Sequence, residues 1–443
     1  MMVNVWKNDW SDNSFAWRYE IHIINIKLLQ YSDGVIIQRR QQHPQDVICF
    51  FIGERILNMF KTLDNFDTIY SADSVEWCPI DDFKDLFVCG TYQLAPEDEQ
   101  SNEKSQKRDG KIYLFRIETM GKLKLLQTID VPAVLDMKWS HVRIQNNIYL
   151  GVVNSIGYIQ IYKLQIDETT GDAMIKLHIE KKLSQKSGDE ILALSLDWST
   201  GKCQNDNIND AKITVSDSEG KITIFNFDSH NDLSVLSSLE EHEFQAWITA
   251  FNYWNTNIIY SGGDDCKFKW YDLRVDTKLI GSNRIHEAGV TSLHSNSNEE
   301  FILASGSYDE KLRIWDTRNF RRPISENNLS GGVWRLKWDP FYHKYLLGAC
   351  MYGGFKLIDC NSIDDPKIIG EYNEHKSIAY GCDWSSLDND TIGSKLSEEN
   401  CQNIVIATCS FYDHKLDLST FILNKLIYLE VFRWSHNTRF VGL

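Results

Sequence analysis

One short segment of the chain holds four side chains that together could cleave a carbonyl compound. Cys409, Ser410, Asp413 and His414 stand within six residues, and Cys350 is a further thiol upstream. A thiol or hydroxyl becomes a nucleophile when a neighbouring base takes its proton, and an acid can orient that base. Cys350, Cys409 and Ser410 are therefore candidate nucleophiles, with His414 as a candidate base and Asp413 as the acid that could orient it.

Asp73 and Asp264 offer a second route, in which a carboxylate activates a water molecule that attacks the carbonyl carbon. The nucleophile signature Gly-x-Ser-x-Gly is absent from the sequence. A Cys also fills buried strand positions as a small apolar residue. The residue types therefore leave both routes open, together with a purely structural role for each candidate.

The chain has 46 basic and 62 acidic residues, which give a net charge of −16 at pH 7. This sign argues against binding to a phosphate backbone and suits a basic protein partner, so we expect no nucleic-acid ligand. The ten Cys form no Cys-x-x-Cys pair and no Cys/His cluster at zinc spacing. This pattern predicts reduced thiols and no metal ion.

The start of the chain lacks a basic export signal, and its longest apolar stretch, Val47 to Ile52, is too short to span a bilayer. No sequence pattern for a nucleotide is present either. We therefore expect a cytoplasmic protein that needs no cofactor and acts as a monomer away from membranes.

Two consecutive segments repeat each other and indicate the elements that must position the candidate residues. His242 to Asp272 and His286 to Asp316 are both 31 residues long and end in an aromatic residue followed by Asp. A His start, a Ser-Gly strand end, an Asp turn and a closing Trp-Asp define one blade of a WD-repeat propeller. The pair therefore predicts two consecutive blades.

Seven short strands share a second pattern, in which an apolar residue precedes an aromatic or small residue by two positions. The seven anchors are Val75/Trp77, Met137/Trp139, Leu196/Trp198, Phe251/Tyr253, Leu293/Ser295, Leu336/Trp338 and Cys382/Trp384. Strands with a period of two follow them, for example residues 111–115 and 158–162. The sequence therefore predicts an all-β fold, a single seven-bladed WD-repeat β-propeller.

The predicted blades cover residues 72–117, 132–165, 190–228, 244–274, 287–318, 331–360 and 377–420. Residues 60–70 are predicted to be the outer strand that closes the seventh blade, because a ring without its last strand would expose an edge. Two polar insertions, 95–110 and 386–403, are predicted to be solvated loops.

Both ends of the chain are harder to assign. Residues 1–58 have no place in the propeller, so we expect an amino-terminal extension followed by a propeller at 59–443, with Met59 as a possible alternative start. The tail after Leu416 reads Asp417-Leu418-Ser419-Thr420 and lacks the Trp that should close the last strand. The outer half of the seventh blade is therefore left open.

The two clear repeats also contain sets of polar residues that resemble a catalytic triad. Because the set occurs twice, and because a propeller core must satisfy its buried polar groups, we interpret both as tetrads that hold a blade together. The two tetrads are His242, Ser261, Asp265 and Tyr271, and His286, Ser305, Asp309 and Trp315.

In a propeller of this type, the starts of the inner strands and the ends of the following strands meet around one mouth of the central channel. Aromatic and acidic residues therefore converge there. The strand-start column holds Asp73, Trp247, Trp334 and Tyr380, and the strand-end column holds Tyr92, Asp264, Tyr308, Tyr352 and Tyr412. Cys350, Cys409, Ser410, Asp413 and His414 are adjacent to the second column.

Four stretches of the divergent blades are not generic repeat sequence. They read YSADSVEWCP at 70–79, CGTYQL at 89–94, GGVWRLKW at 331–338 and ATCSFYDH at 407–414. They resemble the WD-repeat diphthine methyl ester hydrolases, and so do residues 246–248, 260–265, 286–292 and 349–352. The resemblance extends over about residues 60–418.

The resemblance implies removal of a methyl ester from over-methylated diphthine, the modified histidine of elongation factor 2, with diphthine and methanol as products. It implies neither a nucleotide nor a metal. Diphthine carries a trimethylammonium group, which aromatic faces and nearby carboxylates bind. We hypothesise that the rim forms a cage with Asp73 or Asp264 supplying charge and with Trp334, Tyr352, Tyr308 and Trp247 as its walls. Ordinary packing of rim aromatics and anchoring of a protein partner are the alternatives.

Arg335 is the basic residue beside these aromatics, and it could steady a carboxylate product or neutralise Asp264. A different class of function is also compatible with the repeats, namely a non-catalytic WD-repeat scaffold or adaptor for protein complexes.

Overall fold

The computed structural model describes residues 26–31, 34–40, 46–95, 107–185, 190–202, 205–228, 232–275, 278–387, 389–396 and 403–435. Within these residues the chain forms two compact units. One unit is Asn58–Ile422, and the other combines Met1–Leu57 with Leu423–Leu443. The propeller predicted from the sequence, residues 59–443, extends beyond this unit.

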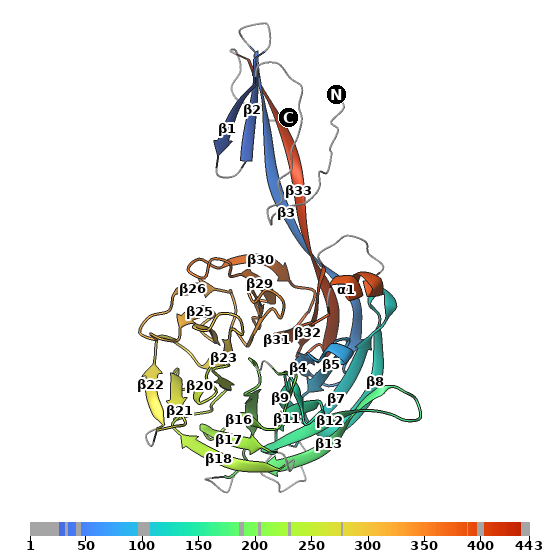
Figure 1. Cartoon of the computed structure of the whole chain (residues 1–443), viewed down its shortest axis with the longest axis vertical. Helices are drawn as coiled ribbons and strands as arrows, with labels where there is room; N and C mark the ends of the chain where they lie inside the picture. The colour runs from blue at the N-terminus through green and yellow to red at the C-terminus, as the bar shows by residue number, and fades with distance from the viewer. Residues whose placement is uncertain are drawn as a thin grey trace. The chain divides into compact units, whose positions relative to one another are not determined.

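The unit Asn58–Ile422 is a seven-bladed propeller, which confirms the predicted fold class. Each blade is an antiparallel sheet, and the blades follow one another around a centre, with β8, β13, β18, β22, β26 and β30 at the perimeter (Figure 1). Small strands β10 (Arg143–Ile144) and β15 (Asn207–Ile208) pair in parallel between two blades.

The first four blades are formed by consecutive strands of the chain. Blade 1 contains β4 (Ala72–Trp77), β5 (Leu86–Thr91), β7 (Arg108–Ile117) and β8 (Leu123–Pro132), with β6 (Gln93–Leu94) paired to β7. Blade 2 contains β9 (Val134–Trp139), β11 (Tyr149–Asn154), β12 (Tyr158–Ile166) and β13 (Ala173–Lys182). Blade 3 contains β14 (Ala193–Trp198), β16 (Ala211–Asp217), β17 (Lys221–Phe227) and β18 (Leu233–Glu240), and blade 4 contains β19 (Ile248–Phe251), β20 (Ile258–Gly262), β21 (Phe268–Asp272) and β22 (Leu279–Asn283).

The last three blades follow the same order until the ring closes. Blade 5 contains β23 (Val290–Ser295), β24 (Ile302–Ser307), β25 (Lys311–Asp316) and β26 (Ser325–Asn328), and blade 6 contains β27 (Arg335–Trp338), β28 (Tyr345–Ala349), β29 (Phe355–Asp359) and β30 (Lys367–Tyr372). Blade 7 contains β31 (Ala379–Trp384), β32 (Asn403–Ser410), β33 (Lys415–Ser435) and β3 (Asp46–Asp67).

Blade 7 is completed by a strand from the opposite end of the sequence, as predicted. In the sheet order β3 lies next to β33, Phe60 packs on Phe421 with ring centroids 4.7 Å apart, and the Thr68 amide donates to the His414 carbonyl. Ser419 takes the place of the closing Trp, because it pairs with Ile406 as Trp315 pairs with Leu303, and the nearby Asp417 carboxylate accepts a hydrogen bond from the Tyr372 hydroxyl at 2.7 Å. The seventh blade is therefore complete despite its unusual sequence.

The anchor tryptophans have a structural role that joins neighbouring blades. The indole N–H groups of four of them donate to a backbone carbonyl of the preceding blade. The pairs are Trp139 to Glu76 at 3.2 Å, Trp198 to Lys138 at 2.9 Å, Trp338 to His294 at 3.1 Å and Trp384 to Lys337 at 2.8 Å. In blade 5, the hydroxyl of Ser295 makes the corresponding bond to Phe251. The anchor pattern thus marks the seams between blades as well as the inner strands.

The insertion at 386–403 is only partly a solvated loop, contrary to prediction. It contains the helix α1 (Asn389–Leu396), and Ile392 and Leu387 are buried in the core of blades 7 and 1 with Val405 and Leu418. Most of the other insertion lies outside the described residues.

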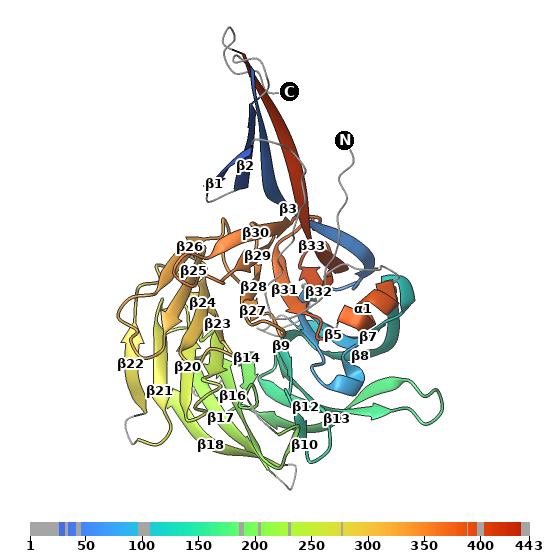
Figure 2. The ribbon, with the colours of Figure 1, turned by 45° about the horizontal axis from the view of Figure 1, so that its top comes forward.

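The second unit contains β1 (Ile26–Tyr31) and β2 (Gly34–Arg40), which pair antiparallel with each other, and β2 pairs with the first part of β3. Its boundaries with the propeller fall within β3 and β33. Figure 2 shows the same strands from a second direction. Within the described residues, no helix is long and apolar enough to cross a membrane.

Candidate active site at the aromatic rim of the channel

Four aromatic side chains from blades 4 to 7 contact one another at the channel mouth where the inner strands begin. Trp334 is central, with ring centroids 4.6 Å from Tyr380, 5.6 Å from Trp247 and 6.0 Å from Tyr308. Trp247 and Tyr308 also contact each other at 6.4 Å. We call these four residues the rim cluster.

The cluster continues toward blade 1 through a residue that the sequence analysis did not select. Phe411 lies 5.0 Å from Tyr380 and 6.1 Å from Tyr92, and it also contacts Tyr412. Tyr352 was predicted to be a wall of the cage, but its side chain is 87% exposed and makes no ring contact among the described residues. Tyr352 therefore lies outside the rim cluster.

Glycines beside the cluster leave room for its members. A Cβ atom on Gly332 would lie 3.3 Å from the Tyr308 ring and 3.0 Å from the Met351 sulfur, and one on Gly289 would lie 2.5 Å from an oxygen of Asp264. The oxygen next to Gly289 is Oδ1 of Asp264, which also accepts a 2.6 Å hydrogen bond from the Trp247 indole N–H. Asp264 thus holds the Trp247 ring in place, and one of its carboxylate oxygens is already hydrogen-bonded.

Asp73, at the start of the inner strand of blade 1, is the most unusual acid of the rim. It is 5% exposed, and no hydrogen bond or ion pair to its carboxylate occurs among the residues that the structure describes. Burial raises its pKa well above the usual value, opposed by the positive charge of Arg335. Its charge acts in turn on the pKa of Tyr380, Tyr308 and Tyr92. The carboxylate therefore lies within electrostatic reach of the rim cluster.

Arg335 does not neutralise Asp264, as one alternative had suggested. Its guanidinium lies 3.3 Å from the carboxylate of Asp136, and both side chains are buried in the channel. Burial alone would raise the pKa of Asp136, but Arg335 and the lysines Lys138 and Lys337 hold it below its usual value. Arg335 thus forms an ion pair with Asp136, and its positive charge also lowers the pKa of Asp73.

The rim also contains an unsatisfied hydrogen-bond donor. The indole N–H of Trp334 is buried and has no partner in the described part of the chain. A buried donor without an acceptor costs free energy, so such groups are rare unless a ligand completes them. An unpartnered carboxylate and an unpartnered N–H therefore belong to the same rim.

The predicted thiol nucleophiles are unsuited to attack. Cys350 and Cys409 are fully buried. Burial raises the pKa of the Cys350 thiol to about 12 and that of Cys409 well above its usual value. Since the thiolate is the reactive form, neither thiol is activated in this environment.

Ser410 is also buried, and its base is not the one predicted from the sequence. Its hydroxyl contacts Nδ1 of His375 at 2.6 Å and donates to Asp413, whereas no hydrogen bond joins it to the His414 side chain. Nε2 of His375 contacts Thr408 at 2.9 Å. Burial lowers the pKa of His375 to about 4, which keeps it neutral.

The cluster around His375 corresponds to the tetrads of blades 4 and 5. His242 contacts Asp265 at 2.9 Å and Ser261 at 2.7 Å, and Ser261 contacts Tyr271. His286 makes the same two contacts with Asp309 and Ser305, and Ser305 accepts from Trp315. In all three blades the turn Asp also accepts the amide that follows the His. Ser410 and Asp413 therefore hold blade 7 together.

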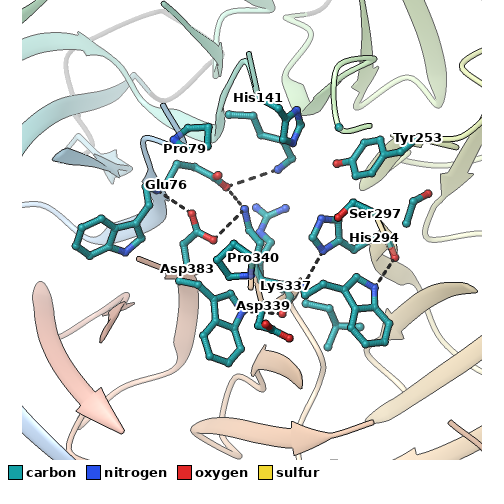
Figure 3. Close-up of a pocket in the computed structure, with 18 of the residues that line it drawn as sticks. Glu76, Pro79, His141, Tyr253, His294, Ser297, Lys337, Asp339, Pro340 and Asp383 are labelled. Atoms are coloured by element: carbon teal, nitrogen blue, oxygen red, sulfur yellow. Dashed lines mark hydrogen bonds and ion pairs between the residues drawn. The ribbon is translucent and has the colours of Figure 1, made fainter. Parts of the chain in front are cut away.

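A cavity of about 250 Å³ lies at the other end of the channel, where the inner strands end (Figure 3). It is lined by buried ion pairs, in which Lys337 contacts Glu76 and lies 3.8 Å from Asp383, while Lys138 lies 3.7 Å from Glu76. The sequence analysis missed this cavity. The signal was present, because the residue before five of the anchor tryptophans is Glu76, Lys138, Asp197, Lys337 or Asp383.

No group of three or more acidic, Cys or His side chains in the described ranges could hold a metal ion. The rim itself presents a carboxylate, an indole N–H and aromatic faces.

Comparison with known proteins agrees with this fold. The WD domain, G-beta repeat family matches residues 277–316. A solved structure, "Crystal Structure of Mitotic Checkpoint Complex", contains a chain that aligns with a TM-score of 0.56 and 14% identity, over 81% of this chain and 93% of that one. At this identity the likeness concerns the fold alone.

Curated relatives are similar over most of the chain. Diphthine methyltransferase of Mus musculus is 40% identical over 74% of this chain and 70% of its own length, and that of Homo sapiens is 39% identical over 73% and 75%. Diphthine methyltransferase of Schizosaccharomyces pombe (strain 972 / ATCC 24843) is 31% identical over 79% of this chain and 95% of its own length. The protein therefore belongs to the family of WD-repeat propellers named diphthine methyltransferase.

Proposed function

We propose that this protein is a carboxylic ester hydrolase of diphthamide biosynthesis that removes the methyl ester from methylated diphthine on elongation factor 2. The products are diphthine and methanol. Membership of the diphthine methyltransferase family supports the pathway and the substrate class. The direction of the reaction, hydrolysis of the ester, rests on the chemistry of the rim.

The observation that carries the proposal is the unpartnered, buried carboxylate of Asp73 next to the rim cluster. A carboxylate near aromatic faces attracts a quaternary ammonium group, because the face of each ring carries partial negative charge. Trp334, Tyr380, Trp247 and Tyr308 would surround the trimethylammonium of the substrate and place its ester at the rim.

The same carboxylate can act as a general base. In the ionised form Asp73 accepts a proton from a water molecule, whose oxygen attacks the ester carbonyl carbon. The unpaired indole N–H of Trp334 can donate to the oxygen on which negative charge develops. When the tetrahedral intermediate collapses, the bond to the methoxy oxygen breaks, and the proton held by Asp73 passes to that oxygen to give methanol.

The test is incubation of the purified full chain with elongation factor 2 that carries methylated diphthine. Mass spectrometry of the modified peptide follows the ester methyl, and released methanol is measured separately. We expect loss of the methyl group with one methanol for each ester cleaved. If the factor binds but keeps its methyl ester, the protein is a non-catalytic adaptor, and the hydrolase proposal is wrong.

Two variants and one control locate the reaction at the rim. Asp73→Asn should lower kcat by about 10²-fold or more, because it removes the base. Trp334→Phe keeps an aromatic ring and removes the N–H, so kcat should fall by about 10²-fold with a smaller change in KM. The matched control is Asp130→Asn on the outer strand of blade 1, where the carboxylate is 85% exposed and bonds only Lys111. Its activity should equal that of the wild type.

The pH dependence gives an independent readout. Because the ionised form of Asp73 is the base and burial raises its pKa, kcat/KM should fall as the pH drops through a value well above the ordinary range for an Asp. An acid limb at the usual carboxyl pKa would contradict the assignment of Asp73.

A further inference from the structure

We propose that the cavity at the opposite end of the channel is a binding site for a small oxyanion, a carboxylate or a phosphate group. It is separated from the rim cluster by the buried pair of Arg335 and Asp136. The inference stands on the hydrogen-bonding capacity of the cavity wall, and it does not depend on the proposed ester hydrolysis.

One wall of the cavity presents two imidazoles on either side of a Tyr ring. His141 lies 5.4 Å and His294 lies 6.1 Å from the Tyr253 ring, each in an edge-on arrangement. In Figure 3 these three side chains lie across the cavity from Glu76 and Asp383.

Contacts on the far side of each ring determine where the imidazole proton sits. Nδ1 of His294 is 3.0 Å from the backbone N–H of Trp338, so it must be the acceptor, and the ring proton is on Nε2. Nδ1 of His141 is 2.8 Å from the Thr200 hydroxyl. Since that oxygen already accepts the His141 amide, its own proton is available for Nδ1. His294 therefore carries an Nε2–H for which the described residues supply no acceptor, and His141 carries a second one when the Thr200 hydroxyl donates to its Nδ1.

Both imidazoles stay neutral, because they are buried and lie near two ammonium groups. Burial lowers the pKa of His141 to about 4 and that of His294 well below its usual value, and Lys337 and Lys138 lower both further. The ammonium groups thus act at the same wall as the free N–H donors. The three basic side chains of the lining, Lys138, Arg335 and Lys337, match its three acidic ones, Glu76, Asp339 and Asp383, so the neutral N–H donors must hold the ligand.

The acceptors of the cavity are already occupied, which excludes a cationic ligand. Glu76 faces both lysines, Asp383 accepts the Trp77 amide at 2.8 Å and faces Lys337, and Asp339 accepts four backbone amides of the turn that follows it. The cavity wall therefore has more free hydrogen-bond donors than free acceptors, and a ligand with acceptor oxygen atoms would pair with them.

The size and lining of the cavity limit the ligand. About 250 Å³ is enough for a small acid but not for a nucleotide or a protein side chain with its backbone. Apolar groups such as Leu293, Leu336 and Pro340 contribute to the wall. The ligand is therefore a compact oxyanion.

The experiment titrates the full chain with sodium acetate, inorganic phosphate and, as an uncharged analogue of acetate, acetamide, at constant ionic strength. Long-range proton–nitrogen NMR spectra follow the Nε2 signals of the histidines. We expect saturable shifts of His141 and His294 with acetate or phosphate at millimolar concentrations, and none with acetamide. Whichever of acetate and phosphate binds with the lower Kd shows whether the site prefers a carboxylate or a phosphate group.

A designed variant separates binding from folding. His294→Asn retains an oxygen that can accept the Trp338 amide but removes the Nε2–H, so the anion should bind at least fivefold more weakly while the protein remains folded. The matched control, His178→Asn, makes the same change on the exposed face of β13 and should leave anion affinity unaltered. If the wild-type signals move equally with acetate and acetamide, or do not move with either anion, the proposal is overturned.

Discussion

The two ends of the central channel are made from the same seven inner strands, yet they treat charge in opposite ways. At the rim, Asp73 is buried without a hydrogen bond or ion pair in the described structure, and the Trp334 indole lacks an acceptor. At the cavity end, Glu76, Lys337 and Asp383 lie in one connected set of ion pairs. A buried polar group without a partner, such as the Asp73 carboxylate, destabilises the fold and indicates a role in ligand binding or catalysis. The paired charges at the cavity end instead connect neighbouring blades.

The largest expected effect is at the cavity end. Glu76→Gln keeps the shape of the side chain but leaves Lys337 and Lys138 without their shared charge partner. The free energy of unfolding should fall by about 3 kcal/mol, because a buried charge is left uncompensated. Chemical denaturation at pH 7 measures it. A loss of well under 1 kcal/mol would show that the remaining carboxylates suffice, and the contrast between the two ends would weaken.

A substitution at the rim should change stability in the other direction. Asp73→Asn removes an unpartnered buried charge, so the protein should gain about 2 kcal/mol at neutral pH while it loses activity. The folded-state pKa of Asp73 is raised, so its ionisation destabilises the fold as the pH rises above the unfolded value. The gain should therefore shrink toward zero as the pH falls to that value. Denaturation curves of both proteins between pH 4 and 7 test this, and equal curves at neutral pH would contradict it.

The smallest expected effect distinguishes two tryptophans at the same position of different blades. Trp384→Phe loses the hydrogen bond to the Lys337 carbonyl, but Trp77→Phe loses none, since the Trp77 indole N–H has no partner among the described residues. Both variants remove the same volume from a buried site. Trp384→Phe should therefore be about 1 kcal/mol less stable than Trp77→Phe. Equal stabilities would mean that these bonds between blades contribute nothing measurable.

Most of the fold could be predicted because it depends on local patterns. The anchors located every inner strand, and the edge argument placed residues 60–70 beside the last blade. The helix α1 escaped prediction because its few apolar residues, such as Ile392, are interspersed with polar ones and become apolar contacts only through the tertiary fold. The division at Ile422 reflects which residues lie close in space, and no pattern inside the repeats reveals this.

The site was only partly predictable for a similar reason. The four members of the rim cluster could be predicted from the positions of strand starts and ends. The repeat determines at which end of the channel each strand start or strand end lies. Pairing across the channel could not be deduced, so Arg335 was expected beside Asp264 and lies against Asp136. His375 was missed because Thr408 replaces the usual Ser, and the spacing from His to that residue is 33 positions instead of 19.

The closure of blade 7 by β3 has a consequence for synthesis of the protein on the ribosome. β3 is among the first strands to emerge, yet its neighbour in the ring, β33, is among the last. Until then, residues 58–67 have no partner strand within the propeller, and an unpaired strand edge invites association with other chains. Six blades can form as translation proceeds, but the ring closes only once Lys415 and the residues after it have left the exit tunnel. That edge therefore stays unpaired while the six blades between β3 and β33 are synthesised.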